Sequence, residues 1–396
     1  MKNILFISWD GPQTNYMEGL FMPIFNEIQN QSEYTFHVIQ FTWKSQEQIS
    51  SIKKIAEDFS VFYTSQPVYR KPNVILGSLY SIQKGIRFIQ QYIVKNDIDI
   101  VMPRSTMPAI MVNRIKNKKF DVLFDADGLP LEERVDFLEL HQGSLQYKFL
   151  KNEELKILTH ADAVITRSKK AINIHLNTIG GKNLEKFSKV INGRDTTFFK
   201  PNEIARTKIR KDLKIDENAK LFVYSGSLGP QYGWEEMISI FTSYYEIHND
   251  AKFLILTGNQ NYANKRIPLE IKDNVIVKNV PFESVPYYLS ACDMAFALRE
   301  PKYSMRGVAP IKLGEYLLMG LPTIASKGIG DTEEILKRIP GCFIYNHHSS
   351  KSLSKALLFI EQSESKLSNE IRIAAIENFS LEKSAASYIK SLNTLL

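Results

Sequence analysis

A stretch near residue 310 holds the residues whose types and spacing are most suggestive of chemistry. It reads Ala309-Pro-Ile-Lys-Leu-Gly-Glu-Tyr-Leu-Leu-Met-Gly-Leu-Pro-Thr-Ile-Ala325. Proline is favoured at the first position of a helix and glycine just past its end, so Pro310 and Gly320 predict a helix over about 310–319. That helix would carry a lysine, a glycine and a glutamate within its first two turns.

Two of these residues are unfavourable in a helix by local rules. Lys312 lies in the first turn, where the helix dipole disfavours a cation by about 0.3–1 kcal/mol. Gly314 in the helix interior costs about 1 kcal/mol relative to alanine. A bound phosphate would offset the cost of Lys312, and close approach of a ligand or of backbone would explain Gly314. Glu315 could accept hydrogen bonds from ribose hydroxyls. The alternative is a surface Lys–Glu pair worth about 0.3–0.5 kcal/mol, and the residues alone leave both interpretations open.

A second segment has the form of a ligand loop. It reads Leu221-Phe-Val-Tyr-Ser-Gly-Ser-Leu-Gly-Pro-Gln-Tyr-Gly-Trp-Glu-Glu-Met237, which predicts a strand, a loop with several glycines, and a helix that begins near Trp234. Backbone amides in such a loop can hold an anion without any side chain. Loops of this kind also occur simply to turn the chain.

The elements that must position these residues follow a regular alternation. A chain of 396 residues exceeds what one hydrophobic core usually organises, so two domains are expected. Short apolar runs alternate with helical patterns, which favours two doubly wound, mostly parallel α/β sheets. Strands are predicted at 3–9, 34–42, 98–102, 120–124, 163–166, 220–224, 252–256, 274–278, 293–297 and 321–325, and helices at 17–29, 46–58 and 77–95.

Turn residues and a terminal proline interrupt the alternation at 191–201. We therefore predict domains at 1–200 and 201–396, with the last helix, about 380–396, packing back on the first domain. Ligands of such sheets bind beyond the carboxyl ends of the strands, so function is expected in the loops that border a central cleft.

Composition and charge narrow the possible classes. The net charge of +7 favours anionic partners, but no basic stretch alternates with aromatic residues, so nucleic-acid binding is not expected. The apolar runs are too short to cross a bilayer, and no secretory signal is visible. Cys292 and Cys342 are too few for a disulfide framework, which favours a reducing cytoplasm.

Four segments together form a recognisable set. They are Pro310-Ile-Lys-Leu-Gly-Glu-Tyr-Leu with Gly320-Leu-Pro, Val223-Tyr-Ser-Gly-Ser-Leu228, Asn192-Gly-Arg-Asp-Thr-Thr-Phe-Phe-Lys-Pro201 and Ala161-Asp-Ala-Val-Ile-Thr166. In order and spacing the chain resembles nucleotide-sugar glycosyltransferases of the GT-B fold, specifically family 4 of the retaining enzymes, which build capsular, lipopolysaccharide and other bacterial surface glycans. The resemblance implies an α/β GT-B architecture of two Rossmann-like domains, and it is strongest in the second domain.

The resemblance places a nucleotide-diphosphate sugar in the second domain, with a UDP-sugar favoured. Family members carry two glutamates eight positions apart. Glu315 matches the later one, which binds the ribose, whereas Gly307 stands where the earlier, sugar-facing one would fall. The basic pair that often follows the Ser-Gly loop is absent at 230–232, and Lys312, Arg299 and Arg306 are the expected replacements. The predicted donor-binding residues are Ser225, Gly226, Ser227, Gly258, Asn259, Val280, Arg299, Arg306, Lys312, Leu313 and Glu315.

Polar residues after strands of the first domain are the candidates for the acceptor. Asp127 could position an acceptor hydroxyl or act as its base, although a solvated loop carboxylate is an equal alternative. The predicted acceptor-binding residues are Tyr16, Glu18, Arg104 and Asp127, and the predicted catalytic residues are Asp127, Glu18 and Lys312. We expect no metal, because the histidines form no ligand spacing and His347-His348 is predicted to lie in an exposed loop.

The expected function is transfer of a sugar from a nucleotide-diphosphate donor to a glycan or lipid-linked saccharide, with retention implied by the family. No cofactor besides the donor is expected. The location expected is cytoplasmic, with peripheral contact to the inner membrane. Two alternatives stay open: a non-hydrolysing nucleotide-sugar epimerase, which shares the two-domain fold, and a non-catalytic nucleotide-sugar-binding subunit, which Gly307 makes plausible.

Overall fold

A computed structural model describes residues 2–116, 118–363 and 368–395, in two compact units. The first unit comprises Met1–Gly193 and Leu381–Leu396, and the second comprises Arg194–Ser380. The second unit therefore begins before position 201, where the sequence predicted the boundary. The reason is local, because the Arg194 backbone N–H donates to the Phe379 carbonyl at 2.7 Å and ties the start of the second unit to its end.

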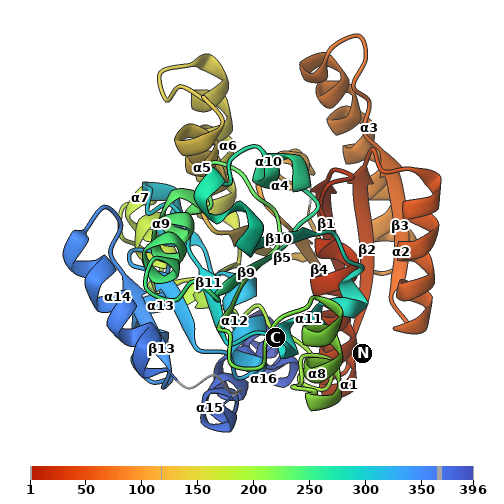
Figure 1. Cartoon of the computed structure of the whole chain (residues 1–396). Helices are drawn as coiled ribbons and strands as arrows, with labels where there is room; N and C mark the ends of the chain where they lie inside the picture. The colour runs from red at the N-terminus through yellow and green to blue at the C-terminus, as the bar shows by residue number, and fades with distance from the viewer. Residues whose placement is uncertain (1, 117, 364–367, 396) are drawn as a thin grey trace. The chain divides into compact units, whose positions relative to one another are not determined.

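The first unit is built on a seven-stranded sheet in the order β3-β2-β1-β4-β5-β6-β7, in which every pair of neighbouring strands is parallel. Its strands are β1 Lys2–Asp10, β2 Tyr34–Thr42, β3 Phe62–Pro67, β4 Ile100–Pro103, β5 Asp121–Asp127, β6 Ala163–Thr166 and β7 Phe187–Lys189. Its α-helices are α1 Met22–Gln31, α2 Gln46–Asp58, α3 Val74–Lys95, α4 Thr106–Asn113, α5 Pro130–Phe137, α6 Leu145–His160, α7 Lys169–Thr178 and α16 Leu381–Leu392. The final helix α16 packs on α1, although the two are far apart in sequence (Figure 1).

The second unit has a six-stranded sheet in the order β10-β9-β8-β11-β12-β13, again with parallel neighbours throughout. Its strands are β8 Leu221–Ser225, β9 Lys252–Leu256, β10 Val275–Lys278, β11 Met294–Ala297, β12 Thr323–Ser326 and β13 Cys342–Tyr345. Its α-helices are α8 Glu203–Asp212, α9 Trp234–Tyr245, α10 Gln260–Asn264, α11 Val285–Ser290, α12 Ile311–Leu318, α13 Thr332–Leu336, α14 Ser350–Gln362 and α15 Asn369–Phe379.

The predicted strands are all present, to within a few residues at their ends. Their apolar runs are buried on both faces of the sheets, except in the half-buried edge strand β10. Three short strands, β3, β7 and β13, were not predicted. In β3 none of the six residues is fully buried, so it lacks the apolar run that marks a central strand. In α3, which the sequence predicted over 77–95, Ile82, Ile86 and Ile89 are buried, whereas Leu79 is exposed.

The strand orders locate the functional end of each unit. In both sheets the order reverses at one point, between β1 and β4 in the first unit and between β8 and β11 in the second. Open α/β sheets bind ligands beyond the carboxyl ends of the strands at this reversal. The residues to inspect are therefore those that follow these four strands. No helix in the described ranges combines the length and apolar character needed to cross a bilayer.

Candidate functional site

The reversal point of the second unit brings together the loops after β8 and β11 and the start of α12. Gly226 and Ser227 follow β8, Arg299 lies two residues past β11, and Lys312 is in the first turn of α12. Tyr316 of α12 fixes the β8 end, because its hydroxyl accepts from the Ser225 N–H at 2.8 Å. The turn after β8 is thus held next to Lys312 in the first turn of α12.

Lys312 is surrounded by aromatic rings. Its ammonium donates to the Tyr224 hydroxyl at 2.9 Å and lies 4.2 Å from the centre of the Tyr232 ring. The Tyr224 hydroxyl in turn donates to the Ser227 carbonyl, so the lysine is connected to the β8 loop. Gly226 has φ of +133°, and a side chain there would overlap the lysine tail, so glycine is needed at this position.

Burial lowers the pKa of the Lys312 ammonium well below its ordinary value, Arg299 lowers it further, and Glu315 partly offsets both. The Arg299 guanidinium lies 4.9 Å from the same Tyr232 ring, so two cations share one aromatic side chain. The Arg299 backbone is held separately, since its N–H donates to Ser326 Oγ at 2.8 Å. Within the described residues neither cation makes an ion pair with a carboxylate.

Glu315 is buried and already has a partner that the sequence did not predict. Its Oε1 accepts from Arg194 Nε at 2.8 Å, and both side chains are nearly inaccessible to solvent. Its Oε2 makes no hydrogen bond to any described residue. One oxygen is thus fixed by the arginine and the other can accept a further bond. The only sequence signal for Arg194 was its place in the 192–201 segment.

The ligand explanation for Gly314 is wrong. A Cβ at this position would lie 2.8 Å from the Phe379 ring, so the glycine lets α15 pack closely on α12. The remaining predicted donor residues are spread around the same loops. Gly258 is exposed with open space beside it, Asn259 Oδ1 accepts from the Leu228 N–H at 3.1 Å, and Leu313 is buried in the core.

Two predicted residues lie apart from this cluster. Val280 is partly buried and packs against the hydrophobic core of the second unit. Arg306 is exposed and rests on Tyr303, at 5.1 Å from the ring centre, so it does not join Lys312 and Arg299. The structure thus brings together two of the three cations that the sequence proposed for the diphosphate.

The carboxyl ends of β4, β5 and β6 in the first unit hold a network of opposite charges. Arg167 binds the fully buried Asp125 through two bonds of 2.8 and 2.9 Å. Arg104 donates to Asp127 at 2.7 Å and lies 3.4 Å from Asp125. Burial opposes the Arg104 charge, but Asp127 and Asp125 outweigh it and raise the Arg104 pKa. Both arginines are therefore neutralised by carboxylates of the same unit, and the Asp127 side chain stays 38% exposed.

Glu18 lies in the same unit, in the single-turn π-helix Met17–Phe21 after β1. Burial raises the pKa of its carboxyl, Lys44 lowers it and Asp10 raises it. One of its oxygens, Oε2, is buried with no hydrogen-bond partner among the described residues. Tyr16, two residues earlier, is 42% exposed. A half-buried carboxyl of this kind can exchange a proton with a bound hydroxyl.

The prediction for the His347-His348 loop is half wrong. His348 is exposed, but His347 is buried and lies near the carboxylate of Glu236. These three residues form the one group in the described ranges whose donor atoms are close enough to hold a metal ion. They lie on the second unit, beside the strand β12 that also carries Ser326.

Comparison with known proteins agrees with this geometry. Residues 205–378 match the family described as Glycosyl transferases group 1, which covers most of the second unit. No curated protein sequence matches the chain. Among solved structures, HepE of Anabaena in complex with UDP is similar with a TM-score of 0.73 and 16% identity over 100% of both chains.

Two further structures are similar over their whole length. The lipopolysaccharide outer core galactosyltransferase WaaB gives a TM-score of 0.67 with 14% identity over 100% of both chains. The sucrose-phosphate synthase of Thermosynechococcus elongatus gives 0.70 with 14% identity, over 100% of this chain and 99% of that one. The GT-B fold is thereby confirmed, and the match of residues 205–378 to the group 1 glycosyltransferase family supports a transferase.

Proposed function

We propose that the second unit binds a nucleotide-diphosphate sugar, with a UDP-sugar favoured, through Lys312, Arg299 and Glu315. The observation that carries this proposal is the pair of cations on Tyr232 at the sheet reversal, neither of which is paired with a carboxylate. Two neighbouring cations repel each other, and a diphosphate between them removes that repulsion. UDP in the HepE structure supports the choice of base.

In this arrangement each group has a separate task. Lys312 and Arg299 stabilise the charge that develops on the leaving diphosphate, which is the step that preorganised cations accelerate most. Oε2 of Glu315 accepts from the ribose hydroxyls while Arg194 holds Oε1. The amides of the loop after β8 add donors to the phosphates. No cofactor is proposed, because the protein's own cations supply the positive charge.

We place the acceptor, a glycan or a lipid-linked saccharide, on the first unit. Arg104 orients Asp127, and the exposed Asp127 carboxylate and the half-buried Glu18 carboxyl contact the acceptor hydroxyl. Transfer with retention follows the family that the motifs resemble. The lipopolysaccharide role of WaaB supports an acceptor in bacterial surface polysaccharide synthesis.

A nucleotide panel tests the donor proposal. Melting temperatures are measured with UDP, GDP, CMP and dTDP and with their sugars, because ligands that bind the folded state stabilise it by about 2.7 kcal/mol at one hundred times the dissociation constant. We expect UDP and one or more UDP-sugars to raise the melting temperature. The absence of a shift with every nucleotide would refute the proposed donor site.

We also propose peripheral contact with an anionic membrane through the start of α3. Apolar side chains are exposed there, with cations nearby: Lys84 Nζ lies 4.8 Å from the Tyr80 ring, and the Arg70 guanidinium lies 4.7 Å from the Trp43 ring. Exposed apolar side chains next to cations are what interfacial helices use to bind anionic lipids. The exposed apolar residues are Val74, Ile75, Leu76, Leu79 and Tyr80.

Vesicle co-sedimentation tests this surface. The double variant Ile75→Ser with Leu79→Ser should lose binding to phosphatidylglycerol vesicles, since both residues are at least half exposed. Ile204→Ser is the matched control, because Ile204 is 83% exposed on α8 of the other unit. Equal sedimentation of the wild-type protein with anionic and with zwitterionic vesicles, or of the double variant and the wild type, would remove the membrane from the proposal.

A further inference from the structure

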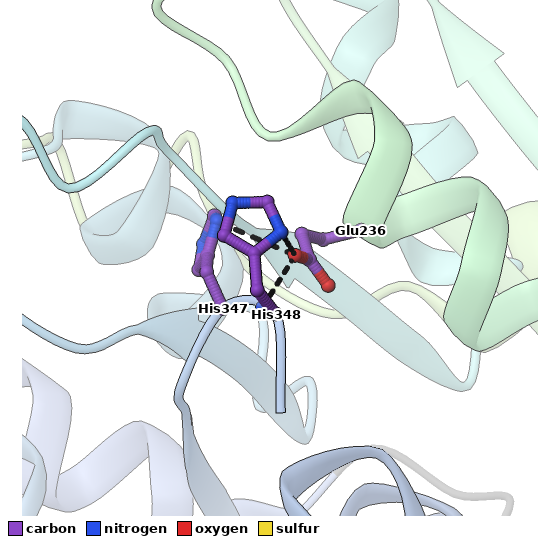
Figure 2. A group of neighbouring side chains, drawn as sticks. All are labelled: Glu236, His347 and His348. Atoms are coloured by element: carbon purple, nitrogen blue, oxygen red, sulfur yellow. Dashed lines mark hydrogen bonds and ion pairs between the residues drawn. The ribbon is translucent and has the colours of Figure 1, made fainter. Parts of the chain in front are cut away.

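A cluster of two imidazoles and a carboxylate lies on the second unit beside the donor loops. His347 and His348 come from the loop between β13 and α14, and Glu236 comes from the first turn of α9. Figure 2 shows both rings turned toward the Glu236 carboxylate. None of the three belongs to the proposed sugar-transfer machinery.

The distances suit a small divalent ion. His348 Nδ1 lies 3.2 Å and His347 Nδ1 lies 3.8 Å from Glu236 Oε1, and all the donor atoms are within 4.8 Å of one another. Two ligands that each stand about 2.0–2.2 Å from a tetrahedral zinc ion lie about 3.3–3.6 Å apart. Small side-chain movements would therefore bring the three donors onto one ion.

His347 supplies an independent observation. The residue is only 8% exposed, yet its Nδ1 is buried with no hydrogen-bond partner among the described residues. The ring is fixed from the other side, because Nε2 lies 2.7 Å from Ser326 Oγ. Buried polar atoms without a partner are uncommon, and a metal ion is one of the groups that satisfies them.

The chemistry of the donors points in the same direction. Imidazole nitrogens and carboxylate oxygens are common ligands of transition-metal ions. A hydrogen bond to the second ring nitrogen is also the usual arrangement for histidine ligands. The remaining oxygen of Glu236 is fixed by the Tyr345 hydroxyl at 2.6 Å, which orients the carboxylate.

We propose that Glu236, His347 and His348 bind a divalent transition-metal ion, with Zn²⁺ as the expected ion. Glu300 Oε1 lies 3.9 Å from His347 Nδ1, but it is outside the group of donors that lie within 4.8 Å of one another and would have to move to become a fourth ligand. Imidazole and carboxylate donors together suit zinc better than calcium or magnesium, which prefer oxygen donors alone. This site is separate from the reaction and does not depend on the proposed donor.

The site is connected to the loop that carries Arg299 in the proposed nucleotide-sugar site. Ser326 Oγ contacts His347 Nε2 and also accepts from the Arg299 backbone N–H, so one hydroxyl joins the cluster to the loop of the proposed diphosphate cation. A Cβ at Gly233, the residue before α9, would lie 3.1 Å from the His347 ring, so the start of α9 packs close to this ring. A bound ion would therefore hold together α9, β12 and the loop after β13.

Calorimetric titration of the purified full-length protein with ZnCl₂ tests the proposal. We expect one ion per chain in the wild type and a loss of affinity of at least tenfold in His348→Ala, since removal of supporting residues alone costs 10- to 100-fold. The His348 side chain is 80% exposed, so this variant should fold normally. His248→Ala is the control, because His248 lies 2.5 Å from Glu361 in a pair that has only one imidazole.

The absorption spectrum of the Co²⁺-loaded protein adds a readout that does not depend on affinity. Visible bands typical of four- or five-coordinate cobalt should appear in the wild type and in His248→Ala and should change in His348→Ala and Glu236→Gln. Zinc binding that His348→Ala and Glu236→Gln leave unchanged, or that only His248→Ala removes, would overturn the proposal. The absence of any zinc binding by the wild type would overturn it as well.

Discussion

The carboxyl ends of the two sheets differ in how their positive charges are paired. In the first unit Arg104 and Arg167 are both paired with Asp125 or Asp127 at 2.7–3.4 Å. In the second unit Lys312 and Arg299 rest on the Tyr232 ring, and within the described residues neither pairs with a carboxylate. An aromatic face stabilises a cation by about 0.5–2 kcal/mol, whereas removal of one partner from a buried ion pair costs about 3–5 kcal/mol because the other charge is left unpaired.

This difference indicates that the second unit is the one suited to bind an anion. Arg104 and Arg167 already have carboxylate partners, whereas Lys312 and Arg299 have none among the described residues and can bind an anionic ligand. Such an arrangement usually costs stability, because functional residues are not optimised for the folded state alone. We therefore expect substitutions in the first-unit network and substitutions at Lys312 to have different effects on the free energy of unfolding and on ligand binding.

The largest effect on stability is expected for Asp125→Asn in the first unit. Asp125 is fully buried between Arg104 and Arg167, and removal of one partner from a buried ion pair costs about 3–5 kcal/mol. Urea denaturation measures the loss. If Asp125→Asn unfolds at the same urea concentration as the wild type, the network does not stabilise the first unit.

Asp127→Asn should have a smaller effect on stability and a larger one on turnover. Asp127 is 38% exposed and adopts a left-handed conformation with φ of +63°, which asparagine tolerates well. We expect a loss of about 1 kcal/mol in the free energy of unfolding and a 10²- to 10⁴-fold lower kcat if the carboxylate acts on the acceptor proton. An unchanged kcat with a matched acceptor would remove Asp127 from the acceptor site.

Lys312→Met is expected to stabilise the second unit. Burial keeps the folded-state pKa of Lys312 well below its ordinary value of 10.5, so between these two pKa values the unfolded chain holds more protons than the folded one. The stability that Lys312 contributes therefore rises with pH through that window, and below it the penalty for the buried ammonium is complete. Removal of the amine should raise the free energy of unfolding by about 0.5–2 kcal/mol at pH 7. A less stable variant would contradict this.

Many of the secondary-structure elements follow from local sequence patterns. The buried strands and the α12 boundaries arise from apolar runs and from Pro310 and Gly320, which act over a few residues. Lys312 and Arg299 could be predicted to approach one another because both follow elements at the same edge of the sheet.

Contacts between distant segments could not be predicted in the same way. Arg194 reaches Glu315 across 121 positions, and Phe379 of α15 explains Gly314. Neither pairing leaves a spacing signal, because it depends on how the helices pack. His347 shows the same limit, since its burial depends on the neighbouring α9 and β12 and not on the polar residues beside it in the sequence.

The dissociation constant of UDP measured by calorimetry for Lys312→Met tests the central claim most directly. Loss of a charge-assisted bond costs about 1.5–3 kcal/mol, so the variant should bind UDP about 10- to 150-fold more weakly than the wild type. Lys302→Met, which removes an exposed lysine from the same part of the chain, should bind as the wild type does. Equal affinity of Lys312→Met and the wild type for UDP would contradict the account.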